Sequence, residues 1–286
     1  MTKKMMALLI AAALCAWPVS QAQAAKKGSL QVKGSDTMVN LVQAWAEEYM
    51  AKNPSFIAVT GGGSGTGLAA LINGTCDIAM SSREIKAKER ALAEAKGIYP
   101  KEFKVALDGL AVIVHPDNPV TGLTTDQLAG IFTGRTRDWK EIGGNPGRIV
   151  ILSREVNSGT HLYFKEHVLR KGDASSREEF SPDALLLPSS QAIADEVAQN
   201  KGAIGYYGMG YISPRQKALK VAPSEGAEAV APTVDNVVSG AYPISRPLFI
   251  YTNGKPEGDT KLFMDYILSP EGQAVVEKID FVPIVK

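Results

Sequence analysis

Hydrophobic positions follow two alternating patterns along most of this chain: short continuous runs, and sets spaced three to four residues apart. The continuous runs predict strands at residues 56–60, 77–80, 149–152 and 203–207, and residues 29–32 are also predicted to form a short strand. The spaced sets predict helices at residues 38–49, 68–72, 86–96, 124–131, 162–169, 192–199, 260–268 and 271–278. Because the two kinds of segment alternate, we predict an α/β fold with mainly parallel sheets.

Two further apolar runs, at residues 107–115 and 247–251, are candidates for strands that cross between two domains. A run this apolar fits a strand buried on both faces. One such strand in mid-chain and one late in the chain are typical of a two-lobed hinge protein that holds its ligand between the lobes. We therefore predict that residues 25–108 plus 246–286 form lobe 1, and that residues 109–245 form lobe 2.

The first 24 residues have the pattern of a secretory signal peptide. Lys3 and Lys4 precede an apolar stretch, and Ala22-Gln23-Ala24 follows it as a small-residue cleavage site. A single membrane anchor is the alternative, but the apolar stretch is shorter than the roughly 20 residues that a spanning helix needs. We expect an exported protein that begins at Ala25 and resides in the periplasm.

Charge and cysteine content exclude several classes of function. The whole chain has 31 basic and 30 acidic residues, so removing Lys3 and Lys4 leaves a net charge of −1. Such a balance argues against a nucleic-acid partner and against a polybasic membrane surface. Without the signal peptide, Cys76 is the single cysteine, and no intramolecular disulfide can form.

Three segments rich in Ser, Thr and Gly each end a predicted strand and begin a helical pattern. They are Gly34-Ser35-Asp36-Thr37, Gly61–Gly67, which contains Ser64, and Asn157-Ser158-Gly159-Thr160. Backbone N–H groups at the start of a helix lack intrahelical partners and carry partial positive charge, which suits an anion. Arg154 stands just before the third segment and adds a permanent positive charge. Together these features predict a site for a small tetrahedral anion.

Other kinds of chemistry fit these segments less well. Residues 61–67 lack the glycine spacing of a dinucleotide loop, and Leu68-Ala69 stands where a Walker A loop needs Lys and Ser or Thr. Ser158 and His161 could suggest a serine hydrolase, but the nucleophile-elbow pattern is missing. His161 and His167 are six residues apart, a poor spacing for a shared metal. We expect neither catalysis, nor a metal, nor any other cofactor.

The chain resembles the periplasmic phosphate-binding proteins of ABC-type phosphate importers over nearly its whole length after the signal peptide. The resemblance rests on residues 34–37, 61–67, 108–114, 123–139, 154–160, 202–206 and 242–247. It implies a type II periplasmic-binding-protein fold, with two α/β lobes, a two-strand hinge and phosphate between the lobes. It also implies delivery to ABC permease subunits, and we expect a monomer.

The resemblance carries the phosphate-binding role over to particular positions. They are Ser35, Asp36, Thr37, Ser64, Ser81, Ser82, Arg154, Ser158, Gly159 and Thr160. Well-known members place an aspartate where Ser82 stands, and that aspartate accepts the hydrogen of protonated phosphate, which sulfate lacks. Our hypothesis is that Asp36 takes over this acceptor role. An ordinary helix cap is the alternative for Asp36.

Two alternative functions remain open, and the departure at Ser82 favours the first of them. The first is a receptor for another tetrahedral oxyanion, such as sulfate, on the same fold. The second is a secreted phosphomonoesterase, which would use Ser158 or Ser64 as its nucleophile. Turnover of a phosphate ester would separate the second alternative from a receptor.

Overall fold

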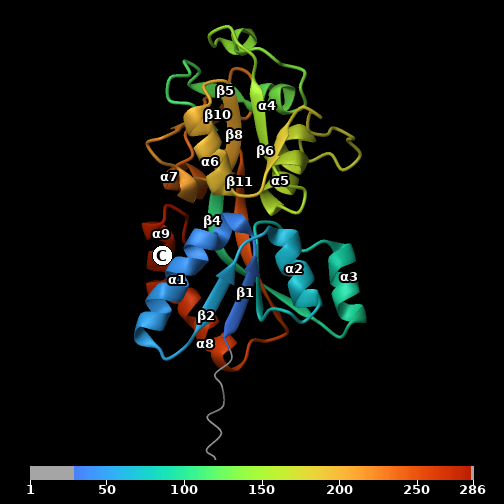
Figure 1. Cartoon of the computed structure of the whole chain (residues 1–286), viewed down its shortest axis with the longest axis vertical. Coiled ribbons are helices and arrows are strands. Elements are labelled where there is room, and N and C mark those ends of the chain that lie inside the picture. Colours follow the sequence, from blue (N-terminus) through green and yellow to red (C-terminus); the bar gives the residue numbers. More distant parts are fainter. Residues whose placement is uncertain (1–28, 285–286) are drawn as a thin grey trace, which may run out of the picture.

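The computed structural model describes residues 29–284, which fold into two α/β lobes stacked along the long axis (Figure 1). Predictions for the signal peptide lie outside the described residues. The lower lobe in Figure 1 contains β1 (Leu30–Gly34), η1 (Asp36–Met38), α1 (Val39–Lys52), β2 (Ile57–Thr60), α2 (Ser64–Ile72), β3 (Ile78–Ser81), α3 (Ala87–Ala95), α8 (Gly258–Ile267) and α9 (Pro270–Lys278). Two long strands, β4 (Pro100–Val114) and β11 (Ser245–Asn253), run between the lobes.

The upper lobe is built from the segment between these two long strands (Figure 1). Its helical elements are α4 (Thr125–Phe132), η2 (Trp139–Ile142), α5 (Gly159–Phe164), η3 (Lys165–Leu169), α6 (Ser190–Gln199), η4 (Met209–Tyr211) and α7 (Val234–Val238). Its strands are β5 (Gly122–Thr124), β6 (Val150–Arg154), β7 (Leu185–Leu187), β8 (Ala203–Gly208), β9 (Lys217–Ala218) and β10 (Lys220–Ala222).

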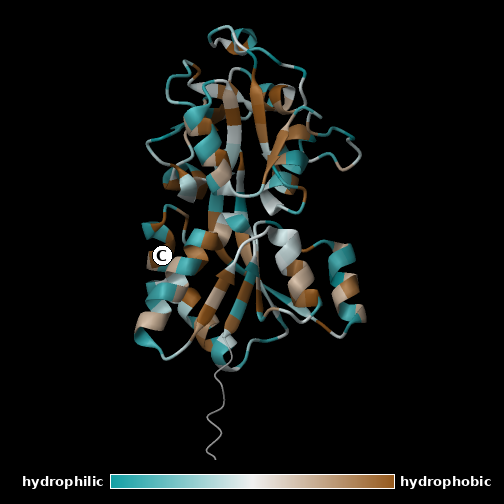
Figure 2. Cartoon of the chain, in the orientation of Figure 1, coloured by the Kyte–Doolittle hydropathy of each residue, from teal (hydrophilic) through white to brown (hydrophobic). Residues whose placement is uncertain are grey.

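One continuous sheet passes through both lobes in the order β2-β1-β3-β11-β4-β8-β6-β7. Strands β1, β2 and β3 are parallel to one another, and β6 is parallel to β7 and β8, as the alternating pattern predicts. Strand β11 lies antiparallel to both β3 and β4. Hydrophobic stretches run along the strands, and the helices carry both hydrophobic and polar residues (Figure 2).

Strand β4 changes its partner where the chain passes from one lobe to the other. Residues 100–109 of β4 pair with β11, and residues 110–114 pair with β8. The stretch Leu110–Val114 is completely buried, as expected for a strand covered on both faces. This change of partner supports the predicted lobe limits at residues 108/109 and 245/246, which we retain as a proposal.

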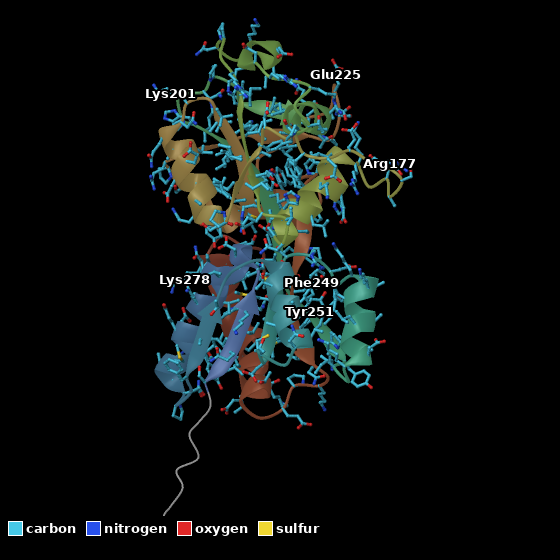
Figure 3. The ribbon with its side chains drawn as sticks, turned by 45° about the vertical axis from the view of Figure 1, so that its right-hand side comes forward. Arg177, Lys201, Glu225, Phe249, Tyr251 and Lys278 are labelled. Carbon is cyan, nitrogen blue, oxygen red and sulfur yellow. The ribbon has the colours of Figure 1, made fainter. Side chains whose placement is uncertain are left out.

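The C-terminal helices complete the lower lobe. Trp45 on α1 is fully buried and donates a 2.7 Å hydrogen bond from its indole nitrogen to the carbonyl of Gly272 on α9. Figure 3 shows the same return of the chain, since Lys201 and Glu225 lie in the upper lobe, whereas Phe249, Tyr251 and Lys278 lie in the lower one. Segments more than 200 residues apart in sequence therefore share one core.

The predicted elements are present, but two helix starts differ from the prediction by three or more residues. Helices α2 and α5 begin at Ser64 and Gly159, earlier than the predicted residues 68 and 162. Their first turns contain Ser, Thr and Gly, so the apolar periodicity begins only after the helix has started. The predicted helix at 162–169 also changes from α to π geometry at Lys165.

Candidate functional site

Each of the three Ser/Thr/Gly segments lies between the end of a strand and the start of a helix, as predicted. The first connects β1 to η1, the second β2 to α2, and the third β6 to α5. Side chains from these turns converge between the lobes. Nine of the ten predicted site residues are buried: Ser35, Thr37, Ser64, Ser81, Ser82, Arg154, Ser158, Gly159 and Thr160.

A hydroxyl cluster, made of Thr37, Ser64, Ser82 and Thr160, forms the centre of the site. The hydroxyls of Thr37 and Thr160, from opposite lobes, share a 2.7 Å hydrogen bond. The hydroxyls of Ser64 and Ser82 are 3.2 Å apart, and the Ser82 amide donates to Ser64 Oγ at 3.0 Å. A hydroxyl can both donate and accept, so this cluster can adapt to a protonated or an unprotonated oxyanion.

Gly159 brings the backbone of α5 against this cluster from the upper lobe. A Cβ atom at this position would lie 2.4 Å from Ser64 Oγ and 2.6 Å from Ser82 Oγ. Those separations are too short for a non-bonded carbon and oxygen, so any side chain would displace the two hydroxyls. The close approach explains why a glycine is needed between Ser158 and Thr160.

Backbone contacts show that the two lobes are closed on each other. The amide of Gly65 donates to the carbonyl of Asn157 at 3.0 Å, and the Asn157 side chain donates to the carbonyl of Gly62 at 2.8 Å. These bonds connect the start of α2 in the lower lobe to the turn before α5 in the upper lobe. A ligand held by groups from both sides stabilises such a closed form.

Arg154 and Asp36 lie at the margin of the site, where they pair across the lobes. Arg154 Nη2 is 3.3 Å from Asp36 Oδ2, and that same oxygen accepts a 2.7 Å bond from the amide of Ser190 at the start of α6. The other contacts of Arg154 are with Ser190 Oγ and with the carbonyls of Leu187 and Pro188. Each nitrogen of this guanidinium thus has a partner within the protein, which sequence alone could not reveal.

Two of the predicted serines have local partners. Ser81 donates to the carbonyl of Arg83 at 2.7 Å, and the structure does not bring its hydroxyl into the cluster. Ser158 caps α5, where its oxygen accepts from the amides of Thr160 and His161 at 3.2 and 3.3 Å. Its hydroxyl hydrogen remains available to a ligand.

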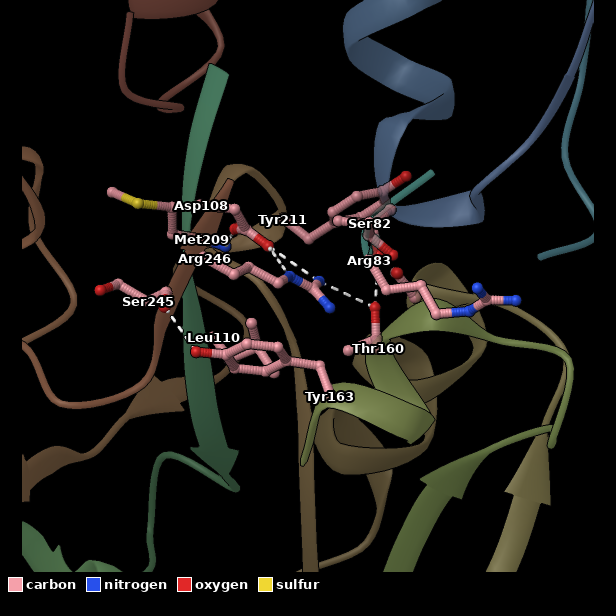
Figure 4. A network of polar contacts seen from close by, with 12 residues as sticks. Ser82, Arg83, Asp108, Leu110, Thr160, Tyr163, Met209, Tyr211, Ser245 and Arg246 are labelled. Carbon is pink, nitrogen blue, oxygen red and sulfur yellow. Dashed lines mark hydrogen bonds and ion pairs between the residues drawn. The ribbon is translucent and has the colours of Figure 1, made fainter. Parts of the chain in front are cut away.

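An ion pair that the sequence analysis missed lies beside the cluster, on the two crossing strands. Asp108 of β4 and Arg246 of β11 occupy paired positions in the sheet, and both are buried. Asp108 Oδ2 accepts from Arg246 Nε at 3.1 Å and from Nη2 at 2.9 Å, while Arg246 Nη2 also donates to Thr160 Oγ1 at 2.9 Å (Figure 4). The available sequence signal was one charge of each sign within otherwise apolar runs.

Burial dominates the electrostatics of Asp108. Its carboxylate has no exposure to solvent, and this desolvation raises its pKa, while the adjacent Arg246 opposes the rise. The amide of Met209 donates to the other carboxylate oxygen at 3.0 Å, so the acid has hydrogen bonds on both oxygens. A buried ion pair of this kind is retained when its remaining polar groups are also satisfied.

His161 lies near the cluster, but its ring is directed toward other residues. Its Nδ1 is 3.3 Å from Ser153 Oγ, which in turn is 2.7 Å from the hydroxyl of Tyr206, and its ring packs on Phe180. The ring therefore contacts Ser153 and not Ser158, the nucleophile that a hydrolase would require. Burial lowers the pKa of His161 to about 4, so the imidazole is neutral at neutral pH.

The low pKa of His161 predicts acid destabilisation. The folded protein keeps this ring neutral down to about pH 4, whereas the unfolded chain protonates it near 6.5. Stability from the neutral ring is complete above pH 6.5 and falls as the pH drops toward 4, by about 3 kcal/mol. Urea unfolding across this range should show the loss in the parent and a smaller one in His161→Asn. Equal pH slopes would contradict the assignment.

Two other kinds of feature do not occur among the described residues. Within residues 29–284, no group of three or more His, Cys, Asp or Glu side chains is placed to hold a metal ion. Across the same residues, no helix has the length and apolar character that crossing a membrane requires. Cys76 is buried, and desolvation raises the pKa of its thiol to about 11.

Comparisons with known proteins agree with this geometry. The family model described as a PBP superfamily domain matches residues 19–271. The phosphate-binding protein PstS of Pseudomonas aeruginosa is 36% identical, covering 94% of this chain and 87% of the relative, and that of Bacillus subtilis is 34% identical, covering 90% and 81%. One similar solved structure is a protein from Clostridium perfringens, described as a putative phosphate ABC transporter substrate-binding protein with bound phosphate. It superposes with a TM-score of 0.79 and is 34% identical in sequence, and the match covers 90% of this chain and 100% of that protein. The chain belongs to the PBP superfamily and, within it, to the family of the PstS phosphate-binding proteins, which have the type II periplasmic-binding-protein fold.

Proposed function

We propose that this protein captures inorganic phosphate between its lobes and delivers it to the permease subunits of an ABC importer. The observation that carries the proposal is the convergence of buried hydroxyls from both lobes, with Thr37 meeting Thr160 and Ser64 meeting Ser82. Relatives named as phosphate-binding proteins and a neighbour described with bound phosphate support the choice of ligand. Export through the signal peptide would place the protein in the periplasm, as a monomer.

The proposed phosphate ligands are hydroxyls and helix N-terminal amides. Ser35, Thr37, Ser64 and Ser82 would contribute from the lower lobe, and Ser158, Gly159 and Thr160 from the upper lobe. Hydrogen bonds to a charged oxyanion contribute about 1.5–3 kcal/mol each, so several of them give tight binding without covalent chemistry. Direct contacts of phosphate with Ser81 and Arg154 stay predictions, because both side chains already have protein partners.

The predicted acceptor role of Asp36 also stays open to test. Its Oδ2 accepts from Ser190 and faces Arg154, while Oδ1 lies on the side of Gly61. The structure therefore gives this carboxylate a contact between the lobes in addition to any contact with phosphate. If Asp36 is the acceptor, Asp36→Asn would bind phosphate more weakly and lose its discrimination against sulfate, whereas full phosphate affinity with full discrimination would refute this role.

Titration calorimetry of residues 25–286, freed of ligand by unfolding and refolding, tests the proposed function. We expect one-to-one phosphate binding with a Kd of about 1 μM or tighter, and sulfate binding at least about 100-fold weaker. Sulfate binding as tight as phosphate binding would reassign the ligand within the same fold. Steady hydrolysis of a chromogenic phosphate ester, abolished in Ser158→Ala, would instead favour the phosphomonoesterase.

A further inference from the structure

One buried nitrogen beside the hydroxyl cluster has no hydrogen-bond partner. Arg246 Nη1 is the one buried side-chain nitrogen or oxygen atom of residues 29–284 that has no hydrogen-bond partner. Arg246 is only 2% exposed, so solvent does not satisfy this nitrogen. Buried polar groups in native proteins nearly always have partners, and an exception calls for a ligand or another specific cause. This nitrogen therefore marks a place where an acceptor from outside the chain would fit.

The other contacts of Arg246 hold its guanidinium in one orientation. Asp108 accepts from Nε and Nη2, and Thr160 Oγ1 accepts from Nη2. Tyr163 covers one face, with the guanidinium carbon 5.4 Å from the ring centroid, and its hydroxyl donates to the carbonyl of Ser245 at 2.5 Å (Figure 4). A planar guanidinium fixed on one edge and one face presents its remaining N–H groups in a single direction.

The position of Arg246 connects the buried cluster with an open cavity between the lobes. This cavity has a volume of about 500 Å³, and Ser82, Tyr163 and Arg246 contribute to its lining. Its other acidic and basic lining residues are Arg83, Lys86, Glu84 and Glu166. Ser82 belongs to the hydroxyl cluster, and Arg246 donates to Thr160 of the same cluster. An anion arriving through this cavity would therefore meet the guanidinium of Arg246 on reaching the hydroxyls.

Arg154, the arginine predicted from the sequence, differs in this respect. Its Nε, Nη1 and Nη2 all have partners within the protein, including Asp36 across the lobe boundary. Recruiting this guanidinium to a ligand would break contacts that hold the closed form together. Arg246 Nη1 can donate a hydrogen bond to a ligand while the guanidinium keeps every bond that it makes now.

We propose that Arg246, positioned by Asp108, is the residue whose guanidinium binds the oxyanion, through Nη1 and beside the hydroxyls of Thr160 and Ser82. The ligand class is a small tetrahedral oxyanion that presents an unprotonated oxygen to the guanidinium. The inference rests on the proposed function, since it assigns the positive group of the same phosphate site.

Charge-preserving substitutions at the two arginines give a matched test by calorimetry with inorganic phosphate. Arg246→Lys is expected to bind about 10- to 100-fold more weakly, because an ammonium cannot contact Asp108, Thr160 and the anion as a planar fork does. Arg154→Lys is expected to lose less than about fivefold, because lysine keeps the positive charge facing Asp36. The reverse order of these losses would overturn the proposal.

A second measurement observes phosphate binding in the unsubstituted protein, and Arg246→Lys serves only to assign one resonance. In protein with isotope-labelled arginine side chains, phosphate should shift the guanidinium resonance of Arg246 and couple it to the phosphorus nucleus. This resonance is the one that is missing from the spectrum of Arg246→Lys. A response confined to the Arg154 resonance would refute the inference and leave the proposed function intact. If the parent protein shows no phosphate binding by calorimetry, the proposed function fails, and this inference fails with it.

Discussion

Gly159→Ala is expected to weaken phosphate binding about 1000-fold, while the free energy of unfolding of the ligand-free protein stays nearly the same. The added Cβ would lie 2.4 Å from Ser64 Oγ and 2.6 Å from Ser82 Oγ, so both hydroxyls must leave their positions when the lobes close. Two displaced hydroxyls and a displaced helix N-terminus together remove about 4 kcal/mol of binding free energy. The open form has no such clash, because these serines lie in the other lobe.

Gly147→Ala provides the matched control. It lies in the same lobe, and a Cβ there would meet nothing within 4 Å. Calorimetry with phosphate and urea unfolding without phosphate should be run on both variants. If Gly159→Ala binds phosphate within about threefold of the parent, the ligand does not lie against the Ser64 and Ser82 hydroxyls, and the proposed site is wrong.

Asp108→Asn is expected to lower the free energy of unfolding by about 3–5 kcal/mol in phosphate-free buffer. The substitution removes the carboxylate that accepts two bonds from Arg246 and leaves a buried positive charge without its partner. Saturating phosphate should restore part of this loss, because a bound anion supplies negative charge next to the guanidinium. Urea unfolding with and without phosphate measures both effects.

Asp117→Asn is the control for this prediction, since Asp117 pairs with Lys201 on the surface. Exposed pairs contribute at most about 1 kcal/mol, so this variant should unfold almost like the parent. Burial raises the pKa of Asp108, so the alternative is that this carboxyl group is protonated in the folded protein. Equal stabilities of the two variants would mean that residue 108 is already neutral in the folded protein, and that it forms no ion pair with Arg246.

The sequence pattern predicted the fold well because its signals are local. Apolar runs of four to six residues and three-to-four-residue spacing located the main strands and helices, and the Ser/Thr/Gly turns located the hydroxyl cluster. The short strands β5, β7, β9 and β10 were not predicted, because two or three residues carry too little periodicity to detect. Helix starts at Ser64 and Gly159 were misplaced for a related reason, since their first turns are polar and small.

The arginines show what such patterns cannot supply. Arg246 and Asp108 are 138 residues apart, and only the register of β11 against β4 brings them together. Arg154 stands next to the most specific motif, yet its direction depends on carbonyls at residues 187 and 188 that follow a long loop. Proximity in sequence thus indicated one arginine, whereas the unpartnered nitrogen lies on the other.

The two ion pairs at the site have a consequence for the surroundings in which the protein can work. Arg154 is paired with Asp36, and Arg246 with Asp108, so the four charged groups around the proposed ligand sum to zero. The other acidic and basic side chains that line the cavity leading to the site, Arg83, Lys86, Glu84 and Glu166, also balance. Without a net local charge, long-range attraction contributes little to the arrival of an anion, and dissolved salt has little attraction to screen. Capture would then proceed at similar rates in dilute and in saline water, which suits a receptor outside the cytoplasm, where ionic strength follows the environment.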